Sequence, residues 1–306
     1  ADAWLPSRER LTVLNDAITA WRHGQLEVEA LLTMGTRMLG DRDPYVARRA
    51  VRLLWAMTPN HLGDDDRRHY DRFALKTFGA RARKLGWLRR DKDDDELHDL
   101  RRLLLSEVAE HDPALRKEAA RLAHAFLRDP SSVPDDIVDH VLSVTAASGD
   151  RDLFDQLVGA AKHATDHRLR RRLLRATGAF RDPALATAAR ELILAPELDR
   201  RESLSILYVQ LWWRPTRDEA WSWARANLAT LLAGMRDDEA SWLLASLGET
   251  HCDRARRDEA AAWLTPMAAK IDGAQNALAQ ARERTDRCIE TMERDLPAIR
   301  RFLMRH

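Results

Sequence analysis

Apolar residues recur along the chain at the spacing of one helical face, and this pattern restricts the fold more than any other feature. In RERLTVLNDAITAW, for example, Leu11, Leu14, Ile18 and Trp21 follow one another at helical intervals. The same spacing recurs in DPYVARRAVRLLWAM, DPALRKEAARLAHAFL, DHRLRRRLLRATGAF and DPALATAARELIL. These intervals place apolar side chains on one face of an α-helix. Because the alternation typical of strands is almost absent, we expect an all-α protein.

Asp-Pro pairs mark expected helix starts at three places. The pairs are Asp43-Pro44, Asp112-Pro113 and Asp182-Pro183. Aspartate accepts hydrogen bonds from the free N–H groups of a first turn, and proline suits the first helical position because its missing N–H has no partner there. We therefore expect about sixteen helices of roughly 12–16 residues, joined by short turns.

Antiparallel helix pairs that each bury one face on the next form an α-solenoid. Pairs recur here at an irregular period of roughly 30–40 residues, which is typical of HEAT-like repeats. We therefore predict one helical domain over residues 1–306, a curved α-solenoid of antiparallel HEAT-like helix pairs. The segment SSVPDD at 131–136 is a possible division between a front and a rear group of helices.

The charge balance argues against a nucleic-acid or membrane partner. Lys+Arg is 50 and Asp+Glu is 49, giving a net charge of +1, so no strong field attracts a polyanion. Only six of the basic residues are lysines. Arginine forms planar, bidentate contacts with carboxylates, and we interpret most arginines as ion-pair partners on solvated helix faces. The arginine-rich bias also suggests a GC-rich genome, and therefore a bacterial source.

The cysteine content indicates a reducing environment. Cys252 and Cys288 are the two cysteines, too few for a disulfide framework, and we expect a cytoplasmic protein. No signal peptide is recognised in ADAWLPSRER, which reads as mature protein. No apolar run approaches the ~18 residues that a membrane span requires.

Two short motifs resemble metal sites but fail their requirements. HATDH would place His163 and His167 four residues apart on one helical face, as in zinc peptidases, yet Ala164 stands where the catalytic glutamate belongs. DKDDDE at 91–96 has alternating acids but lacks the glycine and the final acid of a calcium loop. We interpret the histidines as solvated helix residues and the acidic run as a loop leading into a helix start.

Four tryptophans cluster in WWRPTRDEAWSW: Trp212, Trp213, Trp221 and Trp223. Residues two apart on a helix point to different faces, so Trp221 and Trp223 should not share one core. We expect one to be buried between helices and the other to lie at a surface, and we favour core packing for this cluster over the alternative of an interface. A phosphate-binding glycine loop, GxSxG and CxxC are all absent from the sequence, which by itself does not look like an enzyme.

Four stretches, in order along the chain, resemble the C-terminal helical domain of zinc aminopeptidases of the alanyl, or puromycin-sensitive, type. RERLTVLNDAITAWRHGQLEVEALL resembles the first helix pair of that domain, and LGWLRRDKDDDELHDLRRLLL resembles its Leu-Gly-Trp passage and acidic loop. RPTRDEAWSWARANLATLL is similar to a late helix with arginine, tryptophan and asparagine, and the segment from GETHCDRARRDEAAAW to CIE resembles the end of the domain.

The resemblance implies a noncatalytic domain of a peptidase that removes N-terminal residues from peptides. In this family the domain forms a bowl that caps the active site and shapes the cavity for the peptide. We expect its partners to be the enzyme's own N-terminal catalytic domain and the peptide substrate. We therefore expect the chain to be a fragment, inactive alone, of an enzyme whose zinc is held elsewhere. The sequence lacks HExxH, so no catalytic or zinc-binding residue is carried over. Candidates for lining the cavity are Trp87, Arg101 and Arg217, whose alternative role is structural.

Two other functions stay open on the sequence. The first is a free-standing HEAT-like scaffold that binds a protein partner. The second is an arginine-rich helical protein that binds nucleic acid, which would require a segregated basic face. The residues encoded before Ala1 would separate a scaffold from an enzyme fragment.

Overall fold

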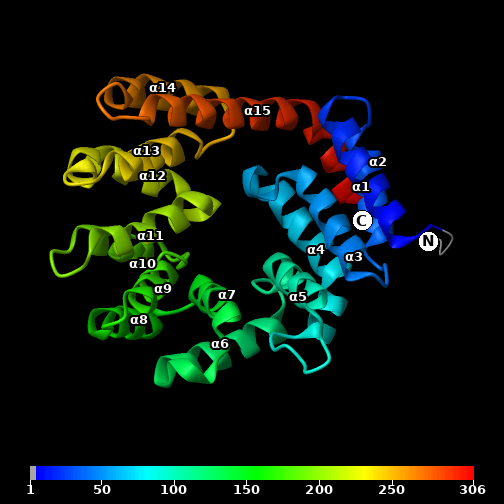
Figure 1. Cartoon of the computed structure of the whole chain (residues 1–306), viewed down its shortest axis with the longest axis horizontal. Helices are drawn as coiled ribbons and strands as arrows, with labels where there is room; N and C mark the ends of the chain where they lie inside the picture. The colour runs from blue at the N-terminus through cyan, green and yellow to red at the C-terminus, as the bar shows by residue number, and fades with distance from the viewer. Residues whose placement is uncertain (1–4) are drawn as a thin grey trace. The chain divides into compact units, whose positions relative to one another are not determined.

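The computed structural model describes residues 5–306, and within this range the chain is entirely helical and contains no strand. The all-α prediction is confirmed, with fifteen α-helices and four short 3₁₀ helices instead of about sixteen helices (Figure 1). The α-helices are α1 (Ser7–Arg22), α2 (Val28–Met38), α3 (Pro44–Leu54), α4 (Asp64–Leu85), α5 (Asp95–Val108), α6 (Pro113–Arg128), α7 (Asp135–Ala147), α8 (Arg151–His163), α9 (His167–Thr177), α10 (Pro183–Glu191), α11 (Arg200–Trp212), α12 (Arg214–Leu232), α13 (Asp237–Gly248), α14 (Arg254–Ala268) and α15 (Ala274–Arg305).

The predicted Asp-Pro helix starts are all confirmed. Helices α3, α6 and α10 begin at the prolines. The preceding aspartates accept backbone hydrogen bonds: Asp43 from Tyr45 N at 2.9 Å, Asp112 from Leu115 N at 3.1 Å, and Asp182 from Leu185 N at 3.0 Å. Each bond satisfies a donor that the first turn of a helix leaves open.

The predicted helix length of roughly 12–16 residues is too short for α4, α12 and α15, which have 22, 19 and 32 residues, and too long for α10, which has 9. No glycine interrupts the chain after Gly273, and Pro297 is accommodated inside α15. Helix α4 ends at Leu85 and is capped by Gly86, whose φ of +66° is favourable for glycine and whose N–H donates to Ala82 O at 2.8 Å. The glycine of the Leu-Gly-Trp motif therefore ends a long helix.

The chain divides into two compact units. The first holds the chain up to Phe126 together with Ser131–His140 and Arg294–His306, and the second holds Leu127–Pro130 and Val141–Glu293. One boundary falls beside the predicted division at 131–136. The second boundary lies within α15 and was not expected. The assignment of residues 1–306 to a single domain stays a prediction.

In the first unit, aromatic side chains join α4 to the end of α15. The rings of Phe73 and Phe302 meet edge to face, with centroids 5.5 Å apart, and Phe73 also contacts Phe78. Trp21 Nε1 donates to Asp295 Oδ2 at 2.8 Å, which fastens α1 to the same end. Helices α2, α3 and α5 complete the packing through the pairs α2–α3, α3–α5 and α4–α5.

In the second unit, consecutive helices pack in the pairs α8–α9, α11–α12 and α13–α14, and α9 also packs against α11. Gly178 allows a close approach after α9, because a Cβ there would lie 2.8 Å from Ile206 O of α11. These pairings agree with a helical repeat domain. None of the described helices has the length and apolar character of a membrane span.

A disulfide joins Cys252, before α14, to Cys288 of α15. The cysteine content predicts a reducing compartment, and disulfides are rare in cytosolic proteins, so this bond is at odds with that expectation. The two Cα atoms lie 5.6 Å apart although 36 positions separate the residues in sequence. The sequence does not indicate the pairing, because α14 and the turn that follows it separate the two cysteines along the chain.

Removing the disulfide should destabilise the second unit. Closing a loop of this length restricts the unfolded chain and typically contributes about 2–4 kcal/mol. We expect Cys252→Ser to lower the free energy of unfolding by that amount, as measured by urea unfolding under oxidising conditions. Cys252→Ser/Cys288→Ser should lose no more than the single variant. An unchanged unfolding midpoint after verified loss of the bond would contradict the prediction.

Candidate functional site

The acidic loop at 91–96 is organised by Arg101, a side chain that is fully buried in the first unit. Its Nη2 donates to the carboxylate of Asp93, and its Nε donates to Leu85 O at the end of α4 at 3.4 Å. The Arg90 backbone N–H also donates to Asp93 Oδ2 at 2.9 Å. Hydrogen bonds from Arg90 and Arg101 lower the pKa of Asp93. The buried cation therefore joins α5 to the loop and to α4.

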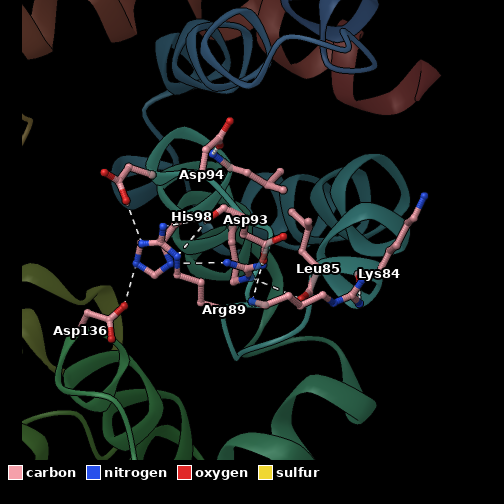
Figure 2. A network of polar contacts seen from close by, with 11 residues as sticks. Lys84, Leu85, Arg89, Asp93, Asp94, His98 and Asp136 are labelled. Atoms are coloured by element: carbon pink, nitrogen blue, oxygen red, sulfur yellow. Dashed lines mark hydrogen bonds and ion pairs between the residues drawn. The ribbon is translucent and has the colours of Figure 1, made fainter.

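The same network extends from α5 to the first turn of α7. His98 Nε2 lies 2.7 Å from Asp136 Oδ2 in the first unit (Figure 2). Asp94 caps α5 by accepting from Leu97 N at 2.8 Å, and Asp95 and Glu96 stand in the first turn. This confirms the interpretation of DKDDDE as a loop and helix start, where the helix dipole favours acids.

Trp87 lies in the core of the first unit, with 2 % of its surface exposed. Its Nε1 donates to Leu115 O at 3.0 Å, and its ring meets His140 edge to face with centroids 5.0 Å apart. Burial, with a smaller contribution from Arg102, lowers the pKa of His140 to about 4. His140 is therefore neutral near pH 7.

Arg217 is buried in the second unit, where it donates hydrogen bonds to carbonyl groups at the end of α11. Its Nε donates to Leu211 O at 3.1 Å and its Nη2 to Trp212 O at 2.9 Å. Burial lowers the pKa of this guanidinium. All three predicted cavity residues thus have structural partners inside their own units, in agreement with the alternative role. Their placement along a peptide cavity stays a prediction.

The prediction that His163 and His167 lie on one face of one helix is wrong. His163 is the last residue of α8, and Asp166 caps the next helix so that His167 is the first residue of α9. His163 Nδ1 lies 2.7 Å from Gly159 O, and His167 Nδ1 lies 2.6 Å from Glu202 Oε1. These two histidines do not fit a zinc site, because each is engaged and they stand on different helices.

The tryptophan prediction is confirmed for the pair in α12. Trp221 is buried, donates from Nε1 to Leu247 O at 3.1 Å, and meets the Trp263 ring with centroids 5.1 Å apart. Trp223 is half-buried. Trp212, at the end of α11, is 60 % exposed.

A cleft of about 580 Å³ in the second unit was not found from the sequence. It lies among α9, the first half of α11, the turn after α12, and α13. Trp242 lines it with 64 % of its surface exposed. The other side chains lining it include Arg171, Leu204, Tyr208, Met235 and Glu239. Burial, helped by the charge of Glu239 and opposed by that of Arg171, raises the pKa of Tyr208 to about 12. The Tyr208 hydroxyl therefore keeps its proton at neutral pH.

Two separate observations would have been needed to find this cleft. One is that Trp242 faces outward, although its helix neighbours Leu243 and Leu244 are buried. The other is that α9 packs against α11, which brings Arg171 and Leu204 to the same cleft. Neither follows from helical periodicity, which assigns apolar residues to faces without saying which helices meet.

Replacing Arg101 should destabilise the first unit far more than replacing its exposed neighbour. Removing one partner of a buried ion pair typically costs about 3–5 kcal/mol, so Arg101→Met should lower the free energy of urea unfolding by that order. Arg102→Met is the matched control and should change it by about 0.5 kcal/mol or less. Equal effects of the two variants would contradict the role of Arg101.

Stability should fall in acid because of His140. Its pKa lies below the usual 6.5 in the folded state, so protonation favours the unfolded chain once the pH drops through the unfolded value. We expect a loss of about 2–3 kcal/mol between pH 6.5 and 4. His140→Phe should remove this component from the pH dependence of urea unfolding, whereas His124→Gln, at an exposed position, should not. An unaltered pH profile for His140→Phe would contradict the assignment.

Comparison with protein families agrees with this architecture. A family model described as "ERAP1-like C-terminal domain" matches residues 2–287, which is nearly the whole chain. None of the curated proteins compared matches the chain. The match extends from α1 into α15 and includes the Arg101 network, Arg217 and the cleft. The chain therefore belongs to the ERAP1-like C-terminal domain family of the zinc aminopeptidases.

Proposed function

We propose that the chain is the noncatalytic C-terminal domain of a zinc-dependent aminopeptidase, where it caps the active site and shapes the cavity that receives the peptide. The observation that carries this proposal is the family match over residues 2–287. The paired helices within each unit fit such a role. In this proposal the domain excludes water from the reacting centre and limits which peptides enter.

The proposal assigns the chemistry to another part of the enzyme. Zinc belongs to a catalytic domain with HExxH, which is missing from this sequence, and that domain is the proposed partner together with the peptide. A bacterial source and a cytoplasmic location belong to the same proposal. The thiol state of Cys252 and Cys288 in freshly lysed cells tests the location, because a reducing cytoplasm disfavours the bond.

The chain alone should hydrolyse no aminoacyl 4-nitroanilide and should retain no stoichiometric zinc after dialysis. The physical reason is that the sequence lacks HExxH, the motif that supplies two zinc ligands and the general base in these peptidases. Release of nitroaniline and elemental analysis of the purified chain measure the two properties. Hydrolysis that co-elutes with the chain and scales with its concentration would contradict the proposal.

A free-standing scaffold is the alternative function. The open reading frame distinguishes the scaffold from the peptidase domain. It should continue before Ala1 into an HExxH-bearing domain if the chain is part of a peptidase. In such an enzyme, changes in this domain should alter kcat/KM for peptides and leave the aminoacyl reporter almost unaffected. A start codon at this position, together with capture of a folded protein in place of peptides, would favour the scaffold.

A further inference from the structure

Helix α9 carries five arginines and no acidic residue. Arg170 pairs with Glu202 at 3.2 Å. Arg168, Arg171 and Arg175 are exposed and stand at positions i, i+3 and i+7, so they lie on one face of the helix. We call these three residues the α9 stripe. Within residues 5–306, no carboxylate forms an ion pair with any of them.

The α9 stripe adjoins the cleft through Arg171, which belongs to both. The carboxylates beside the cleft are already engaged: Asp199 accepts from Arg201 N at 2.8 Å, Asp238 lies 3.0 Å from Arg236, and Glu239 lies 3.1 Å from Arg201. The guanidinium of Arg171 and the hydroxyl of Tyr208 are donors at this site without such partners. The exposed Trp242 ring and the side chains of Leu204 and Met235 add apolar surface.

We propose that the α9 stripe and the adjoining cleft bind an acidic segment of a peptide, with its carboxylates on the arginines and a neighbouring apolar side chain against Trp242. This proposal rests on the proposed function and specifies the class of peptide. The stripe extends about 10 Å along the helix axis, which an extended peptide covers in three or four residues. Glutamates at alternate positions would therefore face the stripe together.

The charge pattern favours a peptide over a nucleic acid. A nucleic acid brings a continuous row of phosphates, which would pass the carboxylates of Asp199, Asp238 and Glu239 at the cleft. A peptide brings isolated carboxylates that can meet arginines, while its apolar side chain and backbone N–H groups meet the rest of the cleft. Charges of both signs beside apolar side chains therefore favour a peptide as the ligand of this cleft.

The experiment measures fluorescence anisotropy of the 306-residue chain with a labelled peptide that has two alternate glutamates and one phenylalanine. Replacing both glutamates with glutamine should weaken binding about fivefold to tenfold at low salt, because two exposed ion pairs are lost. High salt should remove most of this preference.

The variants locate the binding to the stripe. Arg168→Gln/Arg171→Gln/Arg175→Gln should bind the acidic and neutral peptides equally. Arg116→Gln/Arg128→Gln/Arg287→Gln changes the net charge by the same amount at exposed positions outside the stripe and should keep the preference.

The apolar contact is tested in the same way. Trp242→Ala should weaken binding of the phenylalanine peptide several-fold and leave binding of a matched alanine peptide unchanged. Trp212→Ala, at another exposed tryptophan, should leave the binding of both peptides unchanged. Circular dichroism spectra verify that every variant is folded.

The outcomes separate the two proposals. Equal binding of acidic and neutral peptides, unchanged by the stripe variant, overturns this inference and leaves the proposed peptide-binding function standing. Binding of neither peptide overturns both. Tighter, stripe-dependent binding of a labelled single-stranded DNA overturns the inference in favour of a phosphate-binding surface.

Discussion

The C-terminal carbonyl groups of the helices need donors, and arginines from the following segment supply them. A helix leaves its last four carbonyls without intrahelical partners, and a buried carbonyl needs a donor in place of water. Arg101 donates to Leu85 O of α4, Arg170 to Ala164 O after α8 at 2.5 Å, and Arg217 to Leu211 O of α11. Each cation thus joins the end of one helix to the element that donates the arginine.

At these positions arginine has a structural advantage over lysine. A guanidinium presents five donors in a rigid plane, so one side chain reaches a carbonyl and a carboxylate together. Arg101 does so with Leu85 O and Asp93, and Arg170 does so with Ala164 O and Glu202. A lysine ammonium has no comparable geometry. The arginines of the α9 stripe differ from these, because Arg168, Arg171 and Arg175 are exposed and do not join a helix-end carbonyl to a carboxylate.

The fold was predictable from the sequence to the extent that local rules determine it. Periodicity identified the helices, and aspartate with proline located three helix starts at Pro44, Pro113 and Pro183. The pairing of Cys252 with Cys288 and the return of Phe302 to Phe73 were not predictable, because they join segments that are distant in sequence. The histidine pair was misassigned because the Asp166 cap divides it, a competition between local cap chemistry and helical spacing.

The residues of the candidate site were also only partly predictable, because residue type does not reveal burial. Trp87, Arg101 and Arg217 were singled out by residue type, yet burial commits all three to the packing of their own units. A buried side chain that donates to buried carbonyls cannot turn toward a ligand without leaving those carbonyls unpaired, which costs about 1–3 kcal/mol for each. Groups at the cleft, such as Arg171, Tyr208 and Trp242, carry no such cost. Recognition by a domain of this kind should therefore use the side chains that the helix ends do not require.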